Sequence, residues 1–371
     1  MSALGVGIIC RRNGKLLEDL LSQVIECGIE EIVLVDTEPG GSNDGTKEIA
    51  EKYNAKYILD PWDDNFGRSR NVAFSNVTSD YVCWLDTDDV IPEETQRALK
   101  HLVDSGSIYK YSGIHMPYEM WKDNIMQMSF PRERIISRKA YESGVKWVGA
   151  IHECMAFPAD AVKIEYPIQH KPNEHKHHEP GRNLRILEKL YKQGDRNPRT
   201  LFYLGRELYW NGKYERAIKI FNRWLKMDPI DWERYSGTIE LAQCYKLLGM
   251  EDKRLEALLM LAGDQPERAE AWVELGLIYY GRKEWQKALP FFKAAVGLPR
   301  PDYGFIDESK YGVVPYDYLA TCFGWVGKNE EARMITQDIL LMADPENERL
   351  LQNLALYDKV LSTSDDSERN T

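Results

Sequence analysis

Residues 81–89 read YVCWLDTDD, an apolar run that leads directly into a cluster of carboxylates. The run has the length and composition of a buried strand. Carboxylates at the carboxyl end of a strand, here Asp86 and Asp88, can hold Mg²⁺ or Mn²⁺ while leaving positions open for phosphate oxygens. The alternative is that they cap a helix, because Pro92 and Glu93 are residues that often begin one. Both roles can coexist in the four residues after the strand.

Three similar apolar runs come earlier in the chain, at residues 5–10, 32–35 and 56–59. Helix-like patterns separate them, and this alternation predicts an α/β domain with a mainly parallel, Rossmann-like sheet. The second and third runs end at Asp36 and Asp60. Ligands bind beyond the carboxyl ends of the strands in such sheets. We therefore expect both carboxylates to take part in binding a nucleotide.

The segments between these runs hold further polar residues that suit a nucleotide. Asp44 stands in a turn-forming loop, residues 39–45, where capping of the next helix is the alternative role. Arg68 and Arg70 lie beside a predicted helix start. Arginine suits a diphosphate because its donors form a fixed fork. We expect Arg70 to contact the diphosphate, whereas a solvated surface charge is an equal alternative for Arg68.

Charge, cysteines and hydropathy argue against several classes of protein. The 371 residues include 59 acidic and 48 basic residues, which give a net charge of -11. Such a balance repels a phosphate backbone and argues against nucleic-acid binding. The six cysteines are scattered without a Cys-x-x-Cys pair, so neither a zinc site nor a disulfide framework is indicated. Because no signal-peptide pattern and no apolar run of about 18 residues is present, we expect no membrane span and a cytoplasmic location.

The chain from Pro180 onward has a helical pattern that repeats. Four units match, in whole or in part, the tetratricopeptide spacing of a large residue, a Leu-Gly or Leu-Ala pair, an aromatic residue, an alanine and a phenylalanine. The clearest two units contain Gly205 and Gly276, whose small size lets paired helices approach. Pro290 falls inside a predicted helix and is expected to kink it.

These patterns divide the chain into three parts. Residues 1–178 are expected to form the α/β domain, and residues 179–361 an all-α solenoid of tetratricopeptide-like repeats. Residues 362–371 are polar and are expected to be a disordered tail.

Five short motifs together resemble glycosyltransferase family 2 and its subgroup with tetratricopeptide tails, which includes S-glycosyltransferases acting on bacteriocin peptides. The motifs are VDT at residues 35–37, SNDGT at 42–46, WDDNFGRSRN at 62–71, WLDTDD at 84–89 and WVGAIHE at 147–153. The resemblance implies a GT-A fold that binds a nucleotide-sugar together with a divalent metal. One departure is the sequence EPG at residues 38–40, which expands the loop after Asp36 and leaves the choice of nucleotide open.

The resemblance assigns roles to individual residues of the nucleotide-sugar site. Asp36 matches the residue that contacts the base, and Asp86 and Asp88 match the pair that binds the ribose and the metal, with Asp88 the better metal ligand. His152 matches a further ligand of the metal or the diphosphate, and His170 is the alternative. By the same resemblance, Asp44, Asp60 and Arg70 are expected in the nucleotide-sugar site.

Glu153 is the candidate general base by the same resemblance. A structural hydrogen-bonding role is the alternative for the His-Glu pair that it completes. The metal implied is Mn²⁺ or Mg²⁺. Four histidines between residues 170 and 178 leave zinc open, but they lack cysteine or carboxylate partners at a known spacing, which favours a solvated linker.

The implied function is that of a metal-dependent, inverting glycosyltransferase. It would move a sugar from a nucleotide-sugar, with a UDP-sugar favoured, to a peptide, protein or glycan acceptor. The alternative is a catalytically inactive, nucleotide-binding scaffold whose repeats bind a protein partner, and the intact Asp86, Asp88 and Arg70 argue against it. A nucleotidyltransferase is a third hypothesis, but the sequence has no glycine-rich phosphate loop with a lysine near its start.

The repeats are expected to position the acceptor on their concave inner face. By resemblance, the residues that face this groove include Arg206, Tyr209 and Trp210 in the first unit and Tyr280 in the third. Arginines beside exposed aromatic residues are typical of recognition surfaces. The alternative for Trp210 is packing against a neighbouring helix, or against a second copy of the chain in a homodimer.

Overall fold

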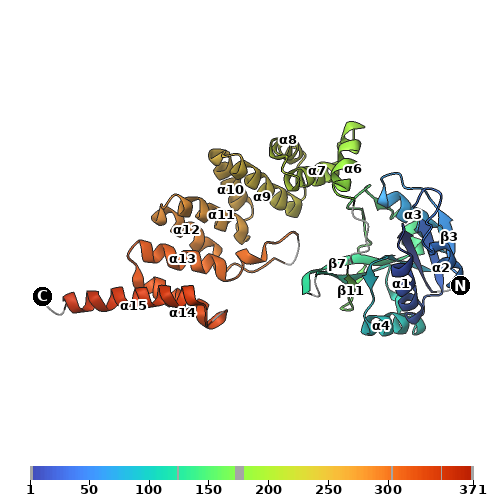
Figure 1. Ribbon diagram of the computed structural model, residues 1–371, viewed down its shortest axis with the longest axis horizontal. Coiled ribbons are helices and arrows are strands. Elements are labelled where there is room, and N and C mark those ends of the chain that lie inside the picture. The colour runs from blue at the N-terminus through green and yellow to red at the C-terminus, as the bar shows by residue number, and fades with distance from the viewer. Residues whose placement is uncertain (1–2, 123–124, 172–178, 302–303, 344, 369–371) are drawn as a thin grey trace. The chain divides into compact units, whose positions relative to one another are not determined.

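The computed structural model describes residues 3–122, 125–171, 179–301, 304–343 and 345–368. The chain divides into two compact units, Met1–Ile186 and Leu187–Thr371 (Figure 1). None of the described helices combines the length and the hydropathy that a membrane crossing requires.

The first unit is built on a nine-stranded mixed sheet. Its strands lie in the order β3-β2-β1-β4-β7-β6-β11-β5, with β10 beside β6. The bounds are β1 Leu4–Cys10, β2 Glu31–Asp36, β3 Lys56–Leu59, β4 Tyr81–Asp86, β5 Asp89–Val90, β6 Gly113–Lys122, β7 Ile125–Ser137, β10 Val162–Lys163 and β11 Ile168–His170. Strands β1 to β4 are parallel, and β7 is antiparallel to β4. The predicted α/β fold is confirmed, and the sheet continues beyond β4 with strands that pair in both directions.

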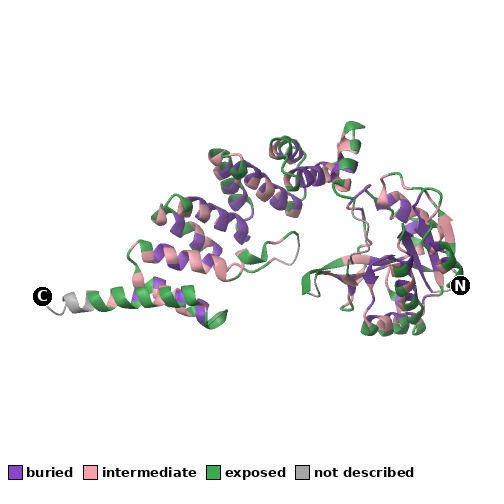
Figure 2. Cartoon of the chain, in the orientation of Figure 1, coloured by how far each residue is buried: buried purple, intermediate pink, exposed green. Residues whose placement is uncertain are grey.

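Helices cover both faces of this sheet because successive side chains of a strand point to opposite faces. On β2, Leu34 joins one core cluster and Val35 the other. The first cluster includes residues of α1 Gly14–Glu26, α2 Thr46–Lys52 and α4 Glu93–Asp104, and the second includes residues of α3 Phe66–Asn76 and α5 Arg138–Glu142. Within the first unit, Figure 2 shows many of the buried residues along the sheet.

The register of the parallel strands brings the ends of β1, β2 and β4 to one edge of the sheet. Cys10 of β1 is the partner of Asp36 of β2, and Ile9 is the partner of Asp86 of β4. The strand-end carboxylates therefore flank the end of β1 from both sides, which is the arrangement that the alternating apolar runs predict.

The second unit consists of paired helices. They are α7 Pro198–Trp210, α8 Tyr214–Leu225, α9 Asp231–Leu247, α10 Glu251–Asp264, α11 Ala269–Gly281, α12 Trp285–Ala295, α13 Val313–Trp325, α14 Asn329–Met342 and α15 Glu348–Glu368. A methyl group at Gly205 would lie 2.6 Å from the Phe221 ring, and one at Gly276 would lie 2.6 Å from the Phe292 ring. Only glycine permits this approach of the two helices, so the predicted tetratricopeptide-like packing is confirmed.

Three features of the helical region bear on the sequence expectations. Helix α12 continues as one helix with Pro290 inside it. Helix α6, Arg182–Lys192, begins in the first unit and ends in the second. Helix α15 includes residues 362–368 of the predicted disordered tail, and the last three residues lie outside the described part of the chain. The domain boundaries predicted from the sequence stay predictions.

Candidate functional site

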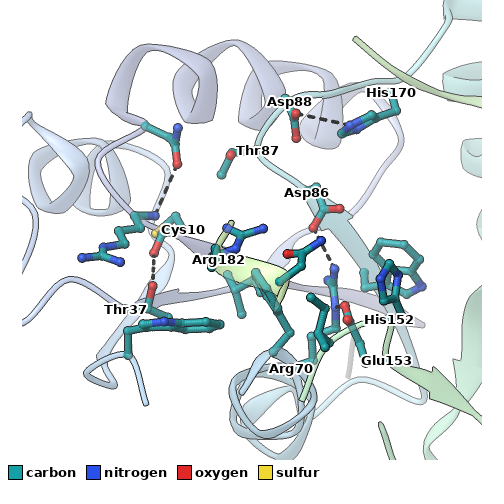
Figure 3. A pocket seen from close by; sticks show the side chains of 18 of the residues that line it. Cys10, Thr37, Arg70, Asp86, Thr87, Asp88, His152, Glu153, His170 and Arg182 are labelled. Carbon is teal, nitrogen blue, oxygen red and sulfur yellow. Dashed lines mark hydrogen bonds and ion pairs between the residues drawn. The ribbon is translucent and has the colours of Figure 1, made fainter. Parts of the chain in front are cut away.

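A cavity of about 750 Å³ opens at the carboxyl edge of the sheet, within the first unit (Figure 3). The ends of β1, β2 and β4 line it, together with residues of β6, β7, β11 and the first turn of α6. Its ionisable lining residues include Arg70, Asp86, Asp88, His152, Glu153, His170 and Arg182. The structure thus brings together six residues that the sequence marks as candidates, from positions between 70 and 170.

The turn after β4 is held in place by Asp89. Its carboxylate accepts hydrogen bonds from the Asp86 N–H (3.0 Å), the Tyr118 hydroxyl (2.9 Å) and Nη1 of Arg134 (3.2 Å). The side chains of Asp89 and Arg134 are both fully buried. Asp89 therefore acts as the internal anchor of the turn, while Asp86 and Asp88 line the cavity.

Asp88, Asp89 and His170 form a group of side chains that could hold a metal ion. His170 Nε2 lies 3.6 Å from Asp88 Oδ2, and ligand atoms of Asp88, Asp89 and His170 all lie within 4.8 Å of one another. Carboxylate oxygens are ligands that Mg²⁺ and Mn²⁺ prefer. Because Asp89 already accepts three hydrogen bonds, Asp88 and His170 are the better ligands of this group.

His152 lies in the same cavity but in another part of it. Figure 3 shows it beside Glu153, whereas His170 lies beside Asp88. Its backbone has a φ of 51°, in the left-handed region that side chains other than glycine seldom adopt. The role of His152 in binding a metal stays a prediction.

Arg70 joins two carboxylates at the base of the cavity. It donates from Nε to Glu153 Oε1 at 2.7 Å and from Nη2 to Asp86 Oδ1 at 2.9 Å. Its guanidinium lies over the ring of Trp84, 4.3 Å from the centroid. Burial disfavours the charge, but Asp86 and Glu153 outweigh it and raise the pKa of Arg70 above its ordinary value. Arg70 therefore gives both carboxylates a buried, charged partner, and its Nη1 has no hydrogen-bond partner among the described residues.

Asp36 is fully buried and does not line the cavity. It accepts hydrogen bonds from the Glu38 and Ser42 N–H groups (3.0 and 2.6 Å), and from the hydroxyls of Ser42 (2.9 Å) and Tyr57 (2.7 Å). The expanded loop after β2 thus folds back onto this carboxylate, while its neighbour Thr37 faces the cavity. Contact of Asp36 with a base stays a prediction that this geometry does not favour.

Asp44 and Asp60 also have internal partners. Asp44 accepts from the Gly14 N–H at 2.8 Å and from the Thr46 hydroxyl at 2.5 Å, which ties the start of α1 to the start of α2. Asp60 accepts from Arg68 Nη1 at 2.7 Å and from the hydroxyl of Ser69 at 3.0 Å. Neither carboxylate lines the cavity, so their roles in nucleotide binding remain unsupported predictions.

Two arginines near the site have no motif that marks them. Arg134 is fully buried between the rings of Trp84 and Tyr118, 3.6 and 4.2 Å from their centroids, and it holds Asp89. Arg182 lines the cavity from the first turn of α6. The sequence places Arg182 in the repeat region, and a charged residue in strand β7 gives no sign of burial.

The predicted acceptor residues lie in the second unit. Arg206 is buried, pairs with Glu240 at 2.9 Å and lies over the ring of Trp210, 4.6 Å from the centroid. Trp210 is 54% exposed, whereas Tyr209 is half-buried. Tyr280 packs edge-on against the rings of Trp285 and Tyr318, each 4.9 Å away. An exposed ring over a buried cation suits recognition, but an acceptor role for these four residues stays a prediction.

Sequence comparisons match both units. Residues 6–163 match the family described as Glycosyl transferase family 2, and residues 253–303 match Tetratricopeptide repeat. Two curated relatives are glycosyltransferases named SunS, one derived from the SPbeta prophage of Bacillus subtilis (strain 168) and one from Bacillus phage SPbeta. Each is 23% identical over 223 residues, which cover 57% of this chain and 50% of the relative. The chain thus spans about half the length of the curated relatives it matches.

Two similar solved structures each cover less than half of this chain. MamA from Desulfovibrio magneticus RS-1 is 19% identical, with a TM-score of 0.36, over 44% of this chain and 86% of that one. The C-terminal part of a TPR repeat-containing protein from Cytophaga hutchinsonii is 11% identical, with a TM-score of 0.40, over 49% of this chain and 66% of that one. These scores are too low to support a further conclusion.

Proposed function

We propose that the protein is a metal-dependent glycosyltransferase, because residues 6–163 match glycosyltransferase family 2 and residues 253–303 match a tetratricopeptide repeat. It would move a sugar from a nucleotide-sugar, with a UDP-sugar favoured, to a peptide, protein or glycan acceptor. The observation that carries the proposal is one cavity, at the carboxyl edge of the sheet, that holds Asp86, Asp88, Glu153 and His170 together.

The residues of this cavity have separate roles in the proposed reaction. Asp88 and His170 would hold Mn²⁺ or Mg²⁺, which when bound would neutralise charge on the departing nucleoside diphosphate. Asp86, held by Arg70, faces the same cavity and suits the ribose. Arg134 and Asp89 keep the turn in place.

Glu153 is proposed as the general base that takes the acceptor's proton as the new bond forms. It lines the cavity, and Arg70 donates a hydrogen bond to its Oε1, which holds the carboxylate in position. Glu153→Gln keeps an oxygen for Arg70 and should lower turnover about 10²-fold or more while donor binding stays intact. Normal turnover in this variant would assign the base to another residue. We further propose inversion at the anomeric carbon, which NMR of the product would test.

Binding of the nucleotide can be measured separately from sugar transfer, and it tests the first step of the proposed reaction. Calorimetry should detect UDP binding that requires Mn²⁺ or Mg²⁺. Asp88→Asn should weaken metal binding, so adding the metal should no longer strengthen UDP binding. Asp104→Asn, at an exposed carboxylate paired with Lys100, is the matched control and should bind like the wild type. Equal UDP binding in excess chelator would remove the metal from the proposal.

The inactive scaffold remains the second candidate function. It would bind the same nucleotide and release no sugar, so turnover rather than binding separates it from an enzyme. The enzyme is favoured because one cavity holds a candidate base, Glu153, two candidate metal ligands, Asp88 and His170, and a carboxylate paired with an arginine, Asp86.

The acceptor is proposed to bind the repeats beside Trp210. Arg206 is unsuitable for a test, because its removal would leave Glu240 buried without its partner and destabilise the fold. Trp210→Ala alters an exposed ring, and it should lower sugar transfer while hydrolysis of the donor by water continues. A parallel fall in both activities would oppose the acceptor proposal. A change in sedimentation of the variant would instead assign Trp210 to a homodimer.

A further inference from the structure

Arg182 lines the cavity, and its charge has no ionic partner among the described residues. It lies in the first turn of α6 and faces the cavity that holds Asp86 and Asp88. Its guanidinium lies over the ring of Phe66, 4.9 Å from the centroid, and its Nε is buried without a hydrogen-bond partner in the described part of the chain. Arg182 also forms no ion pair within 4.0 Å with any residue that the structure describes.

The other arginines that line the cavity each form an ion pair, although Arg11 and Arg12 share one carboxylate. Arg11 pairs with Glu38 at 2.7 Å, Arg12 pairs with the same carboxylate, and Arg70 holds two carboxylates at once. Arg132 is the weaker case, since its Nε lies 3.6 Å from its neighbour Glu133. Arg182 is therefore the arginine of this lining that forms no ion pair with a described residue, and an anion that enters the cavity would supply one.

The surroundings of Arg182 disfavour its charge when the cavity holds no anion. Burial lowers the pKa of Arg182, and the opposing influence of Glu179 and Glu153 is too weak to restore it. A negatively charged ligand would supply the missing compensation, because charge-assisted hydrogen bonds are strongest where water is excluded.

Arg182 is also held in position before any ligand arrives. Three residues further along α6, Arg185 donates from Nη1 to both oxygens of Asp64, at 2.9 and 3.0 Å. Asp64 in turn accepts from Trp62 Nε1 at 3.1 Å, and the Trp62 ring packs edge-on against Phe66, 4.6 Å away. The first turn of α6 is thus fastened to the loop before α3, and a preorganised donor loses less entropy on binding.

We infer that Arg182 binds the diphosphate of the nucleotide-sugar donor, an inference that rests on the proposed function. In the proposed reaction the bond from the anomeric carbon to the diphosphate oxygen breaks, and its electron pair stays on that oxygen. A bond forms from the acceptor atom to the same carbon, and the acceptor's proton passes to Glu153. Arg182 keeps its proton throughout and donates N–H groups to the phosphate oxygens, in the fork geometry that suits them.

A second consequence concerns the connection between the two units. Because α6 starts in the first unit and continues into the second, the same helix carries a donor-binding residue and leads into the repeats.

The diphosphate is preferred over an acceptor carboxylate as the ligand of Arg182, because Arg182 shares its cavity with the strand-end residues Thr37 and Asp86.

The test is titration of UDP and GDP into the full chain at one fixed Mn²⁺ concentration, with wild type, Arg182→Gln and Arg182→Lys. Arg182→Gln should weaken binding of the diphosphate about ten- to hundredfold, the range for loss of a charge-assisted hydrogen bond. Arg182→Lys keeps the charge without the fork and should fall between. Arg97→Gln removes an exposed arginine whose side chain is 73% exposed, and it should leave affinity unchanged.

The outcomes distinguish a failure of diphosphate binding by Arg182 from a failure of the proposed glycosyltransferase function. Equal affinity of Arg182→Gln and wild type would overturn the inference and leave the proposed function standing. Absence of UDP and GDP binding by the wild type would overturn the proposed function and the inference together. If near-UV circular dichroism shows that Arg182→Gln disturbs the fold, Arg182→Lys decides: partial recovery of UDP binding supports the inference, and no recovery in a correctly folded Lys variant contradicts it.

Discussion

Replacing Arg70 by methionine removes the charge that joins Asp86 and Glu153 in the candidate site. Methionine has a similar length and can still pack on Trp84, so the main loss is electrostatic. Removing one partner of a buried ion pair destabilises a protein by about 3–5 kcal/mol, because the other charge stays buried without compensation. The Glu153 side chain is 11% exposed and that of Asp86 is 27% exposed, so water can reach Asp86 in part. We therefore expect a loss near the lower end, about 3 kcal/mol of the free energy of unfolding.

Scanning calorimetry of the full chain measures this loss. In a unit that spans Met1–Ile186, about 3 kcal/mol corresponds to a fall of about 6–12 °C in the Tm of that unit's transition. Arg70→Met combined with Glu153→Gln should recover part of the fall, because one uncompensated charge is then absent. Arg97→Met breaks an exposed pair with Glu93 and should change the Tm by about 1–2 °C at most. A fall for Arg70→Met no larger than that of Arg97→Met would refute the argument that a buried cation organises this site.

Two further predictions concern packing and thiol chemistry. Gly276→Ala places a methyl group 2.6 Å from the Phe292 ring and should lower the free energy of unfolding of the repeats by about 1–3 kcal/mol. Calorimetry should show a lower Tm for the transition of the repeats and no change for the first unit. An unchanged transition of the repeats would contradict the close packing of α11 on α12. Burial raises the pKa of Cys83 to about 12, so at pH 8 only about one thiol in 10⁴ is ionised, and a disulfide reagent should modify it only after unfolding. Rapid modification of Cys83 in the native protein, mapped by mass spectrometry, would show that β4 opens readily.

Much of the sheet could be predicted from the apolar runs, and with it the location of the site. Strands β1 to β4 are continuous apolar segments that end in polar residues, and ligand sites in parallel sheets lie at such ends. This reasoning located Asp86 and Asp88 correctly at the cavity. It depends only on local sequence and on a general rule of topology, which is why it needed no knowledge of long-range contacts.

Asp36 also ends a strand, but it is buried and does not line the cavity. It stands at a strand end like Asp86, yet the loop after it supplies its own hydrogen-bond donors, from Glu38 and Ser42. Short aspartate side chains often bond to backbone groups a few residues away, and this competes with ligand binding. Whether a loop folds back in this way depends on its conformation, which the expanded sequence EPG at residues 38–40 did not reveal.

The two unmarked arginines could not be predicted because their environments come from distant parts of the chain. Arg134 bonds to the Trp84 carbonyl across 50 residues, and Arg185 fixes the turn that carries Arg182 through Asp64, 121 residues away. Burial of a charge is a property of such tertiary contacts, since charged residues are seldom fully buried without a partner.

Release of UDP from a nucleotide-sugar tests the central claim most directly, because hydrolysis by water needs no knowledge of the acceptor. The purified chain would be incubated with a panel of UDP-sugars and Mn²⁺, with UDP measured by mass spectrometry for wild type, Asp88→Asn and Glu153→Gln. The account predicts UDP release from at least one UDP-sugar by the wild type, suppressed by chelator and at least about tenfold slower in Asp88→Asn. No release from any UDP-sugar, or an equal rate in Asp88→Asn and wild type, would contradict the claim that this cavity is the catalytic centre of a metal-dependent glycosyltransferase.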